Sequence, residues 1–207
     1  DDWKRPIYYA VTVGDFPLNL YGQLSLEGIS YRISPGKVSR SRVNTEVMYD
    51  NMMNKFKWGG SNNPKVYLDE NNLRMCRTFR MMFSQLITAL LEEGKKDKAL
   101  AALDKCMEVF PSNTVPRSSE SLAFVDAYYE LGQEAKAEKV MGEILDRTDR
   151  SLQWYARLSK YDIMASSVDI RDYLDTEIRT LDVYQRNNRS KYEQLLKKTM
   201  DRTEMFL

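Results

Sequence analysis

Histidine is absent from the 207 residues of the chain. The sequence therefore has no imidazole general base and no Ser-His or Cys-His pair that could activate a nucleophile, and it lacks the commonest zinc ligand. Its two cysteines, Cys76 and Cys106, cannot form a metal site by themselves. From these absences we expect no catalytic residue, no metal and no cofactor, and we expect a non-catalytic function.

The chain also lacks an excess of charge of either sign. Lysine and arginine number 31 against 30 for aspartate and glutamate, which gives a net charge of +1. A surface that binds nucleic acid would require a cationic excess. We therefore expect no nucleic-acid partner.

Long hydrophobic runs are missing as well. The longest, such as residues 86–91 with Thr88 inside, are much shorter than the roughly 20 residues that cross a bilayer. We therefore expect no membrane span in this sequence. Its first six residues contain neither the apolar core of a signal peptide nor an initiator methionine, and we expect the chain to be a piece of a longer protein.

A stretch from Arg80 to Pro111 has the spacing of a two-helix repeat. One helical stripe of apolar residues precedes Gly94, and a second stripe follows it and ends before Pro111. The two stripes consist of Phe83, Leu86, Ile87 and Leu90, and of Ala99, Leu103 and Cys106. This spacing is typical of a tetratricopeptide unit in which aliphatic residues replace the usual aromatic ones.

The same pattern recurs 38 residues later, from Gly94 to Gly132 and from Ala99 to Ala137. Leu86, Leu90 and Leu103 have their counterparts in Phe124, Tyr128 and Met141. A tetratricopeptide unit has about 34 residues, and the loop at 112–116 accounts for the additional ones. We expect antiparallel helix hairpins that stack in a right-handed superhelix, with repeats at about 80–111 and 118–149.

The first 68 residues predict a small α+β cap that packs on the helices. Residues 6–13 and 29–34 have the composition or alternation of strands, and Pro17 to Leu24 fits a short helix between them. Thr45 is the expected N-cap of a helix that reaches Lys57, and residues 66–68 form a short extended piece. A long helix then begins at Asp69 or Asn71 and ends at Gly94.

The C-terminal helices predict a degenerate end of the helical-repeat region at 69–207. Trp154, Leu158 and Tyr161 mark one helix from about residue 151, and two more follow from about 170 and 190. No Gly-x4-Ala turn joins the first two of these helices, as expected of a terminal unit. We expect the cap and the helices to form one folded unit. If the first repeat is antiparallel, Cys76 and Cys106 come close, so a disulfide and two buried thiols both stay possible.

The first helices of such repeats line the concave side of the array. The candidate groove residues on these helices are Met81, Ser84, Thr88, Leu91, Ser119, Leu122, Asp126 and Tyr129. This set is mixed in polarity and lacks the paired Lys and Asn side chains with which some tetratricopeptide domains hold a peptide carboxylate. Trp58 and Tyr67 are alternative candidates for stacking on a sugar ring. Both acidic pairs, 69–70 and 92–93, lie at helix ends and favour capping over acid/base catalysis.

Four segments carry a resemblance to a known family. They are DWKRPIYYA at 2–10, LEGISYR at 26–32, MYDNMMNKFKWG at 48–59 and VYLDE at 66–70. Together they resemble the C-terminal region of a family of multi-pass membrane proteins from Bacteroidetes. That family is labelled as of unknown function and described as protein O-mannosyltransferase-like. The resemblance extends over residues 3–111, and after that it is only a general likeness to helical repeats.

The resemblance implies a place for the chain in a longer protein. In that family a membrane portion precedes this region and is thought to transfer a sugar from a lipid carrier. The resemblance therefore implies an accessory module on the periplasmic side of the bacterial inner membrane, whose partner is another protein or its own membrane-embedded portion. A sugar- or acceptor-binding module that serves glycosyl transfer is the alternative.

Overall fold

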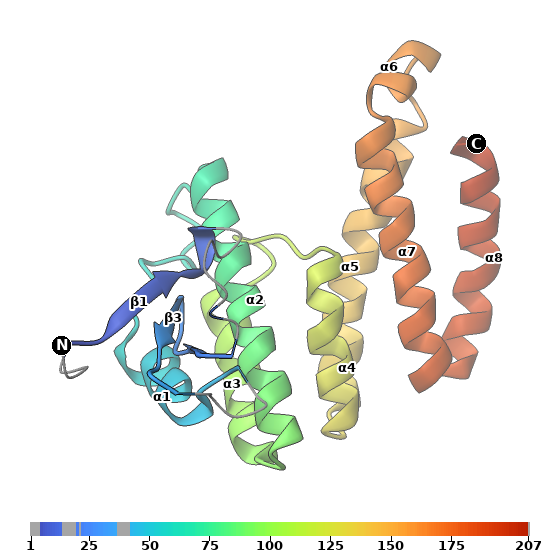
Figure 1. The fold of residues 1–207 in the computed structure, drawn as a ribbon. Helices are drawn as coiled ribbons and strands as arrows, with labels where there is room; N and C mark the ends of the chain where they lie inside the picture. The colour runs from blue at the N-terminus through green and yellow to red at the C-terminus, as the bar shows by residue number, and fades with distance from the viewer. Residues whose placement is uncertain (1–4, 14–19, 21, 37–41, 207) are drawn as a thin grey trace. The chain divides into compact units, whose positions relative to one another are not determined.

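The computed structural model describes residues 5–13, 20, 22–36 and 42–206 and is mainly helical, with one small antiparallel sheet (Figure 1). The chain divides into two compact units, residues 1–115 (unit 1) and 116–207 (unit 2). The boundary that we expected from the sequence was near residue 68. Among the described residues, none of the helices is both long and apolar enough to cross a membrane.

The sheet of unit 1 contains three strands: β1 (Ile7–Ala10), β2 (Leu24–Leu26) and β3 (Ser30–Ile33). The strand order is β1-β3-β2, and both pairings are antiparallel. The two-stranded prediction was wrong about Leu24, which lies in β2 and not in a helix. Leu24 and Leu26 are both buried because alternate residues of a strand share one face. The rest of the helix expected at 17–24 falls largely outside the described residues.

Helix α1 (Thr45–Asp50) continues directly into a π-helical turn, η2 (Asn51–Lys55). Met48 and Met52 are fully buried, which confirms the apolar stripe expected on this segment. The N-cap is Asn44 and not Thr45, because the Asn44 side chain accepts a hydrogen bond from the backbone N–H of Val47. The hydroxyl of Thr45 instead donates to Glu93. The extended piece expected at 66–68 forms no strand.

Helices α2 (Glu70–Glu92) and α3 (Lys96–Val109) form the helix hairpin of unit 1. Asp69 caps α2 by accepting from the N–H of Asn72 at 2.7 Å, as its position in the sequence predicts. Cys76 and Cys106 are both buried thiols, and no disulfide joins the two helices.

An aromatic cluster fills the space beside this hairpin. Its members are Phe56, Trp58, Phe79, Phe83 and Phe110. The ring centroids of Trp58 lie 5.3–5.9 Å from those of the other four. Such edge-on and tilted pairs contribute about 1 kcal/mol each beyond the burial of their area. The cluster therefore joins the turn after η2 to both helices of the hairpin.

Unit 2 contains a short 3₁₀ turn, η3 (Ser119–Ser121), and five helices in the described residues. These helices are α4 (Leu122–Glu130), α5 (Glu134–Tyr155), α6 (Lys160–Ala165), α7 (Ser167–Asn187) and α8 (Arg189–Phe206). The helix start expected near residue 151 was wrong, because α5 continues to Tyr155. Its buried stripe of Ile144, Thr148 and Leu152 keeps the four-residue spacing without a proline or a turn glycine.

The turns of the two hairpins have the same backbone geometry, although each lies in a different unit. Gly94 follows α2 with φ 72°, and Gly132 follows α4 with φ 70°. In each turn the glycine N–H donates to the backbone carbonyl of the residue three positions before the glycine. The N–H of the residue after the glycine donates to the carbonyl five positions before that residue. All four hydrogen bonds are 2.8–2.9 Å long. This is the Schellman termination of a helix, which favours glycine because its φ is positive. Ala99 and Ala137 are both fully buried in the helix that follows.

Replacing Gly132 with alanine is expected to destabilise unit 2 by about 1 kcal/mol, because a Cβ in the left-handed region is strained even where space is open. Gly142 is the matched control: it lies inside α5 with open space around its Cα. Gly142→Ala is expected to stabilise the helix by about 0.5–1 kcal/mol. Urea unfolding of both variants measures the difference, and a Gly132→Ala variant at least as stable as the unchanged protein would contradict the assignment of the turn.

Candidate functional site

The four groove candidates of unit 1 lie along one face of α2. Their spacing of three, four and three residues places Met81, Ser84, Thr88 and Leu91 in a single helical stripe. Met81 is 51% exposed and Thr88 is exposed, while Ser84 and Leu91 are half-buried. The stripe is therefore a mixed surface that lies opposite the buried face of the same helix.

The four groove candidates of unit 2 are buried or half-buried, or have hydrogen-bond partners inside the unit. Leu122 is buried, and Ser119 is half-buried in η3. The Nη2 of Arg186 in α7 donates to both carboxylate oxygens of Asp126, at 3.0 and 3.2 Å, and Asp126 also accepts from Asn187. These contacts come from the end of α7, which packs against both α4 and α5.

Tyr129 belongs to a network around Glu138 of α5. The hydroxyl groups of Tyr129 and Tyr184 both donate to this carboxylate, and Asn188 and Lys191 approach it from the α7–α8 turn. Burial by itself would raise the pKa of Glu138, but the hydrogen bond from Tyr129 and the charge of Lys191 outweigh it and lower the pKa. Burial, together with Glu138, raises the pKa of Tyr129. The network joins four segments of unit 2. The hydroxyl of Tyr129 is therefore already bonded to Glu138 inside the unit.

The two sugar-stacking candidates have different surroundings. Trp58 is half-buried in the aromatic cluster, where four other rings contact it, and this packing favours a structural role. Tyr67 is 88% exposed and is not a member of that cluster.

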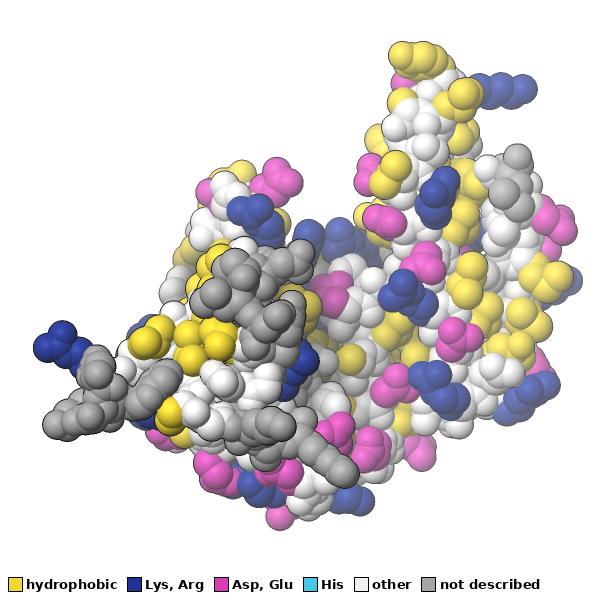
Figure 2. Space-filling model, in the orientation of Figure 1, with side chains coloured by type: hydrophobic (Ala, Val, Ile, Leu, Met, Phe, Trp, Pro, Cys, Tyr) yellow, Lys and Arg dark blue, Asp and Glu magenta, His cyan; other side chains and the backbone are white. Residues whose placement is uncertain are grey.

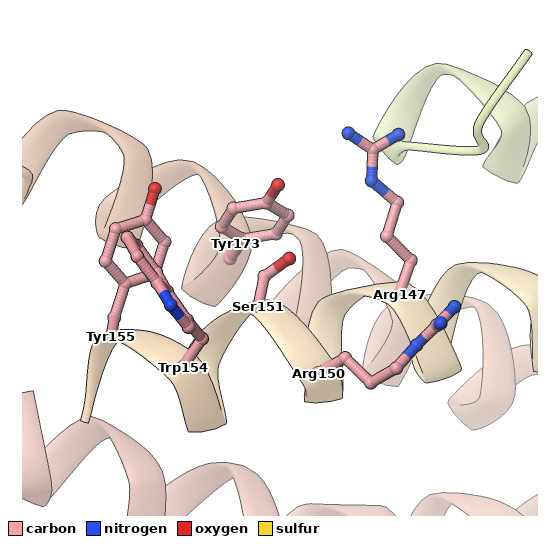
Figure 3. Close-up of a pocket in the computed structure, with 6 residues that line it drawn as sticks. All are labelled: Arg147, Arg150, Ser151, Trp154, Tyr155 and Tyr173. Carbon is pink, nitrogen blue, oxygen red and sulfur yellow. The ribbon is translucent and has the colours of Figure 1, made fainter. Parts of the chain in front are cut away.

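A pocket of about 320 Å³ lies on unit 2 between α5 and α7 (Figure 3). It is lined by Arg147, Arg150, Ser151, Trp154, Tyr155 and Tyr173. Five of these residues come from the last two turns of α5 and the turn before them, and α7 contributes only Tyr173. Figure 3 shows the indole of Trp154 and the ring of Tyr155 at one end, the guanidinium of Arg147 at the other, and Ser151 and Tyr173 between them. We refer to this site as the α5–α7 pocket.

The aromatic end of the α5–α7 pocket is held together by contacts between its rings. The ring centroids of Trp154 and Tyr155 are 4.9 Å apart, and those of Tyr155 and Tyr173 are 6.2 Å apart. The hydroxyl of Tyr155 donates to Asp169 at 3.3 Å, and burial and that carboxylate together raise the pKa of Tyr155. Trp154 nevertheless stays 57% exposed, so its ring is accessible to a ligand.

The sequence predicts Trp154 and Tyr161 on one helix from about residue 151, and this prediction was wrong because Trp154 lies in α5 and Tyr161 in α6. Trp154 is more than half exposed and Tyr161 is 80% exposed on α6, where Figure 2 shows hydrophobic side chains at the surface. A signal for the pocket was present in the sequence. Arg147, Ser151 and Trp154 are spaced by four and three residues, which places a cation, a hydroxyl and an aromatic ring on one helix face.

A second charged feature of unit 2 lies between α5, α7 and α8. Arg202 of α8 pairs with Glu177 of α7 and with Asp149 of α5, and Lys198 also pairs with Asp149 at 2.9 Å. Glu177 is 1% exposed, and burial raises its pKa to about 7 against the opposing charge of Lys198. The described residues contain no cluster of three or more potential metal ligands.

Comparison with known proteins assigns no family and no function to the chain. No protein family, no curated protein and no solved structure matches the chain.

Proposed function

We propose that this protein is a non-catalytic helical-repeat module that binds another protein. The observation that carries the proposal is the helix hairpin built twice at a spacing of 38 residues, with matching turns at Gly94 and Gly132 and matching buried alanines. Within unit 2, α7 packs on both helices of the preceding hairpin, which is how a following repeat packs in stacked arrays. These features support a tetratricopeptide-like architecture.

The face of α2 is the proposed protein-binding surface. Two of its four stripe residues, Met81 and Thr88, are exposed, whereas Asp126 and Tyr129 of unit 2 already have partners inside the unit. A mixed surface of exposed methionine with small polar residues suits a peptide or helix of a partner, because methionine adapts its shape to irregular surfaces.

The resemblance over residues 3–111 supports a specific context for this module. In that context it is the extracytoplasmic, C-terminal tail of a glycosyltransferase-like membrane protein on the periplasmic side. Its partner is then an acceptor polypeptide or the membrane-embedded portion of its own chain.

The test of this function is capture of a partner that depends on the α2 face. The intact chain is cross-linked in an extract of the cells that produce it, and captured proteins are identified by mass spectrometry. Met81→Glu and Thr88→Arg are expected to reduce capture of a specific partner at least tenfold, because they place charge on the binding face. Glu108→Arg on α3, an equally exposed site away from that face, is the control. Equal capture by all variants would rule out the α2 face.

A further inference from the structure

Arg147 is the unusual cation of the α5–α7 pocket. Its guanidinium donates one hydrogen bond, to the backbone carbonyl of Arg117 at 3.2 Å, and no carboxylate pairs with it among the residues that the structure describes. The group has five N–H donors in a planar fork, which suits a carboxylate or phosphate oxygen pair. This half-buried side chain therefore retains donors that face the pocket.

The carboxylates near the pocket are already engaged. Asp146 pairs with Arg150 at 2.7 Å, Asp149 pairs with Lys198 and Arg202, and Asp169 accepts from Tyr155. Asp169 is at the aromatic end of the pocket. An anionic group is thus favoured at the Arg147 end and disfavoured at the Trp154 end, and this asymmetry orients a ligand.

The distance between the two ends limits the shape of that ligand. Arg147 and Trp154 are seven residues apart on α5, a rise of about 10 Å. In a polyproline II segment, residues i and i+3 lie on the same side and about 9 Å apart. A peptide in this conformation can therefore present an acidic side chain to Arg147 and a large apolar side chain to Trp154 at the same time.

We infer that the α5–α7 pocket binds an extended acidic peptide segment of a protein partner, with Asp or Glu at position i and a large apolar residue at i+3. The inference rests on the proposed function as a protein-binding module and specifies the chemistry of the partner. Arg147 holds the carboxylate, and Ser151 and Tyr173 offer hydroxyl groups to the peptide backbone between the two anchors. Trp154 covers the apolar side chain. Arginine, tryptophan and tyrosine are the residues that most often dominate the energetics of protein interfaces, and arginine clusters and aromatic grooves are recurrent recognition devices for acidic and extended peptides.

The test measures binding of defined peptides to the full chain by fluorescence anisotropy. The probe is a fluorescein-labelled peptide with the core Glu-Pro-Pro-Leu between Gly-Ser flanks. Saturable binding is expected for this peptide, with at least about tenfold weaker binding for cores Lys-Pro-Pro-Leu and Glu-Pro-Pro-Ser, which remove one anchor each. Equal binding of all three peptides, or no binding of any, would overturn the inference.

Variants assign the binding to the pocket. Arg147→Gln and Trp154→Ser are each expected to weaken binding about tenfold or more, and circular dichroism checks their folding. Trp154→Ser keeps the test decisive if Arg147→Gln unfolds, because Trp154 is largely exposed. Arg189→Gln, which removes an exposed cation at the start of α8, is the control and is expected to change binding less than twofold. Wild-type affinity in both pocket variants would contradict the proposal.

Competition separates the peptide from smaller ligands and from the proposed function itself. Inorganic phosphate and glucose 1-phosphate are expected to displace the labelled peptide only at concentrations far above its dissociation constant. Tight binding of either one without peptide binding would make the pocket a small-anion site and overturn the inference. The function of the α2 face is measured by cross-linking, so loss of peptide binding with intact α2-dependent capture would refute the pocket alone.

Discussion

Replacing Arg80 with methionine is expected to destabilise unit 1 by about 3 kcal/mol. Arg80 is fully buried on α2, and its Nη2 donates to the carbonyl oxygens of Phe110, at 3.0 Å, and Val115. Phe110 is the C-cap of α3, where helix carbonyls lack partners within the helix. Methionine fills much of the volume but removes the donor to both carbonyl oxygens, and the loss of a hydrogen bond to a buried polar group costs about 1–3 kcal/mol.

The measurement is urea unfolding followed by tryptophan fluorescence in a Trp154→Phe background, so that the remaining tryptophans belong to unit 1. Arg77→Met is the matched control, because Arg77 is exposed one turn earlier on the same helix and its loss is expected to cost less than about 0.5 kcal/mol. Similar small effects of the two substitutions would show that Arg80 does not secure the end of α3.

The stability of unit 2 is expected to decrease by about 3 kcal/mol between pH 4.5 and pH 7, apart from the contributions of other groups. Burial raises the pKa of Glu177 from its ordinary 4.5 to about 7. A raised pKa means that folding takes up a proton in this window, so the stabilisation is complete below pH 4.5 and is lost as the pH rises through 7. Above pH 7 the charged carboxylate depends on Arg202 for compensation.

Glu177→Gln is expected to remove this slope, because glutamine keeps the shape of the side chain and has no proton to lose. Urea unfolding at several pH values measures it through Trp154 in a background where Trp3 and Trp58 are phenylalanine. The control is Glu193→Gln on α8, which pairs with Arg189 at an exposed site and is expected to leave the slope intact. A slope that persists in Glu177→Gln would assign the titration to another group.

The features that the sequence predicted well are those determined by short-range chemistry. Asp69 caps α2 because its side chain reaches an N–H three residues ahead, and Gly94 and Gly132 end their helices because only glycine adopts their φ without strain. The buried alanines follow each turn at a fixed interval. Such signals lie within a few residues of one another and can be read directly from the chain.

The features that the sequence did not predict depend on distant partners. Strand β2 is only three residues long, and its pairing with β3 and not its local propensity holds Leu24 in a strand. The role of Arg80 could not be predicted because its partners are backbone carbonyls 30 and 35 residues away. Every residue type has a backbone carbonyl, so the sequence does not indicate which ones accept from Arg80. The exposure of Trp154 could not be predicted because a helical stripe in the sequence does not show whether another helix covers it.

Site-specific photo-cross-linking measures whether the face of α2 binds a protein. A benzoylphenylalanine residue is placed at Met81 or Thr88 on that face, or at Glu108 on α3, and the intact protein is irradiated in an extract of the cells that produce it. We expect one specific cross-linked protein, or the membrane-embedded portion of the same chain, from positions 81 and 88 and none from 108. The same products from all three positions, or none from 81 and 88, would contradict it.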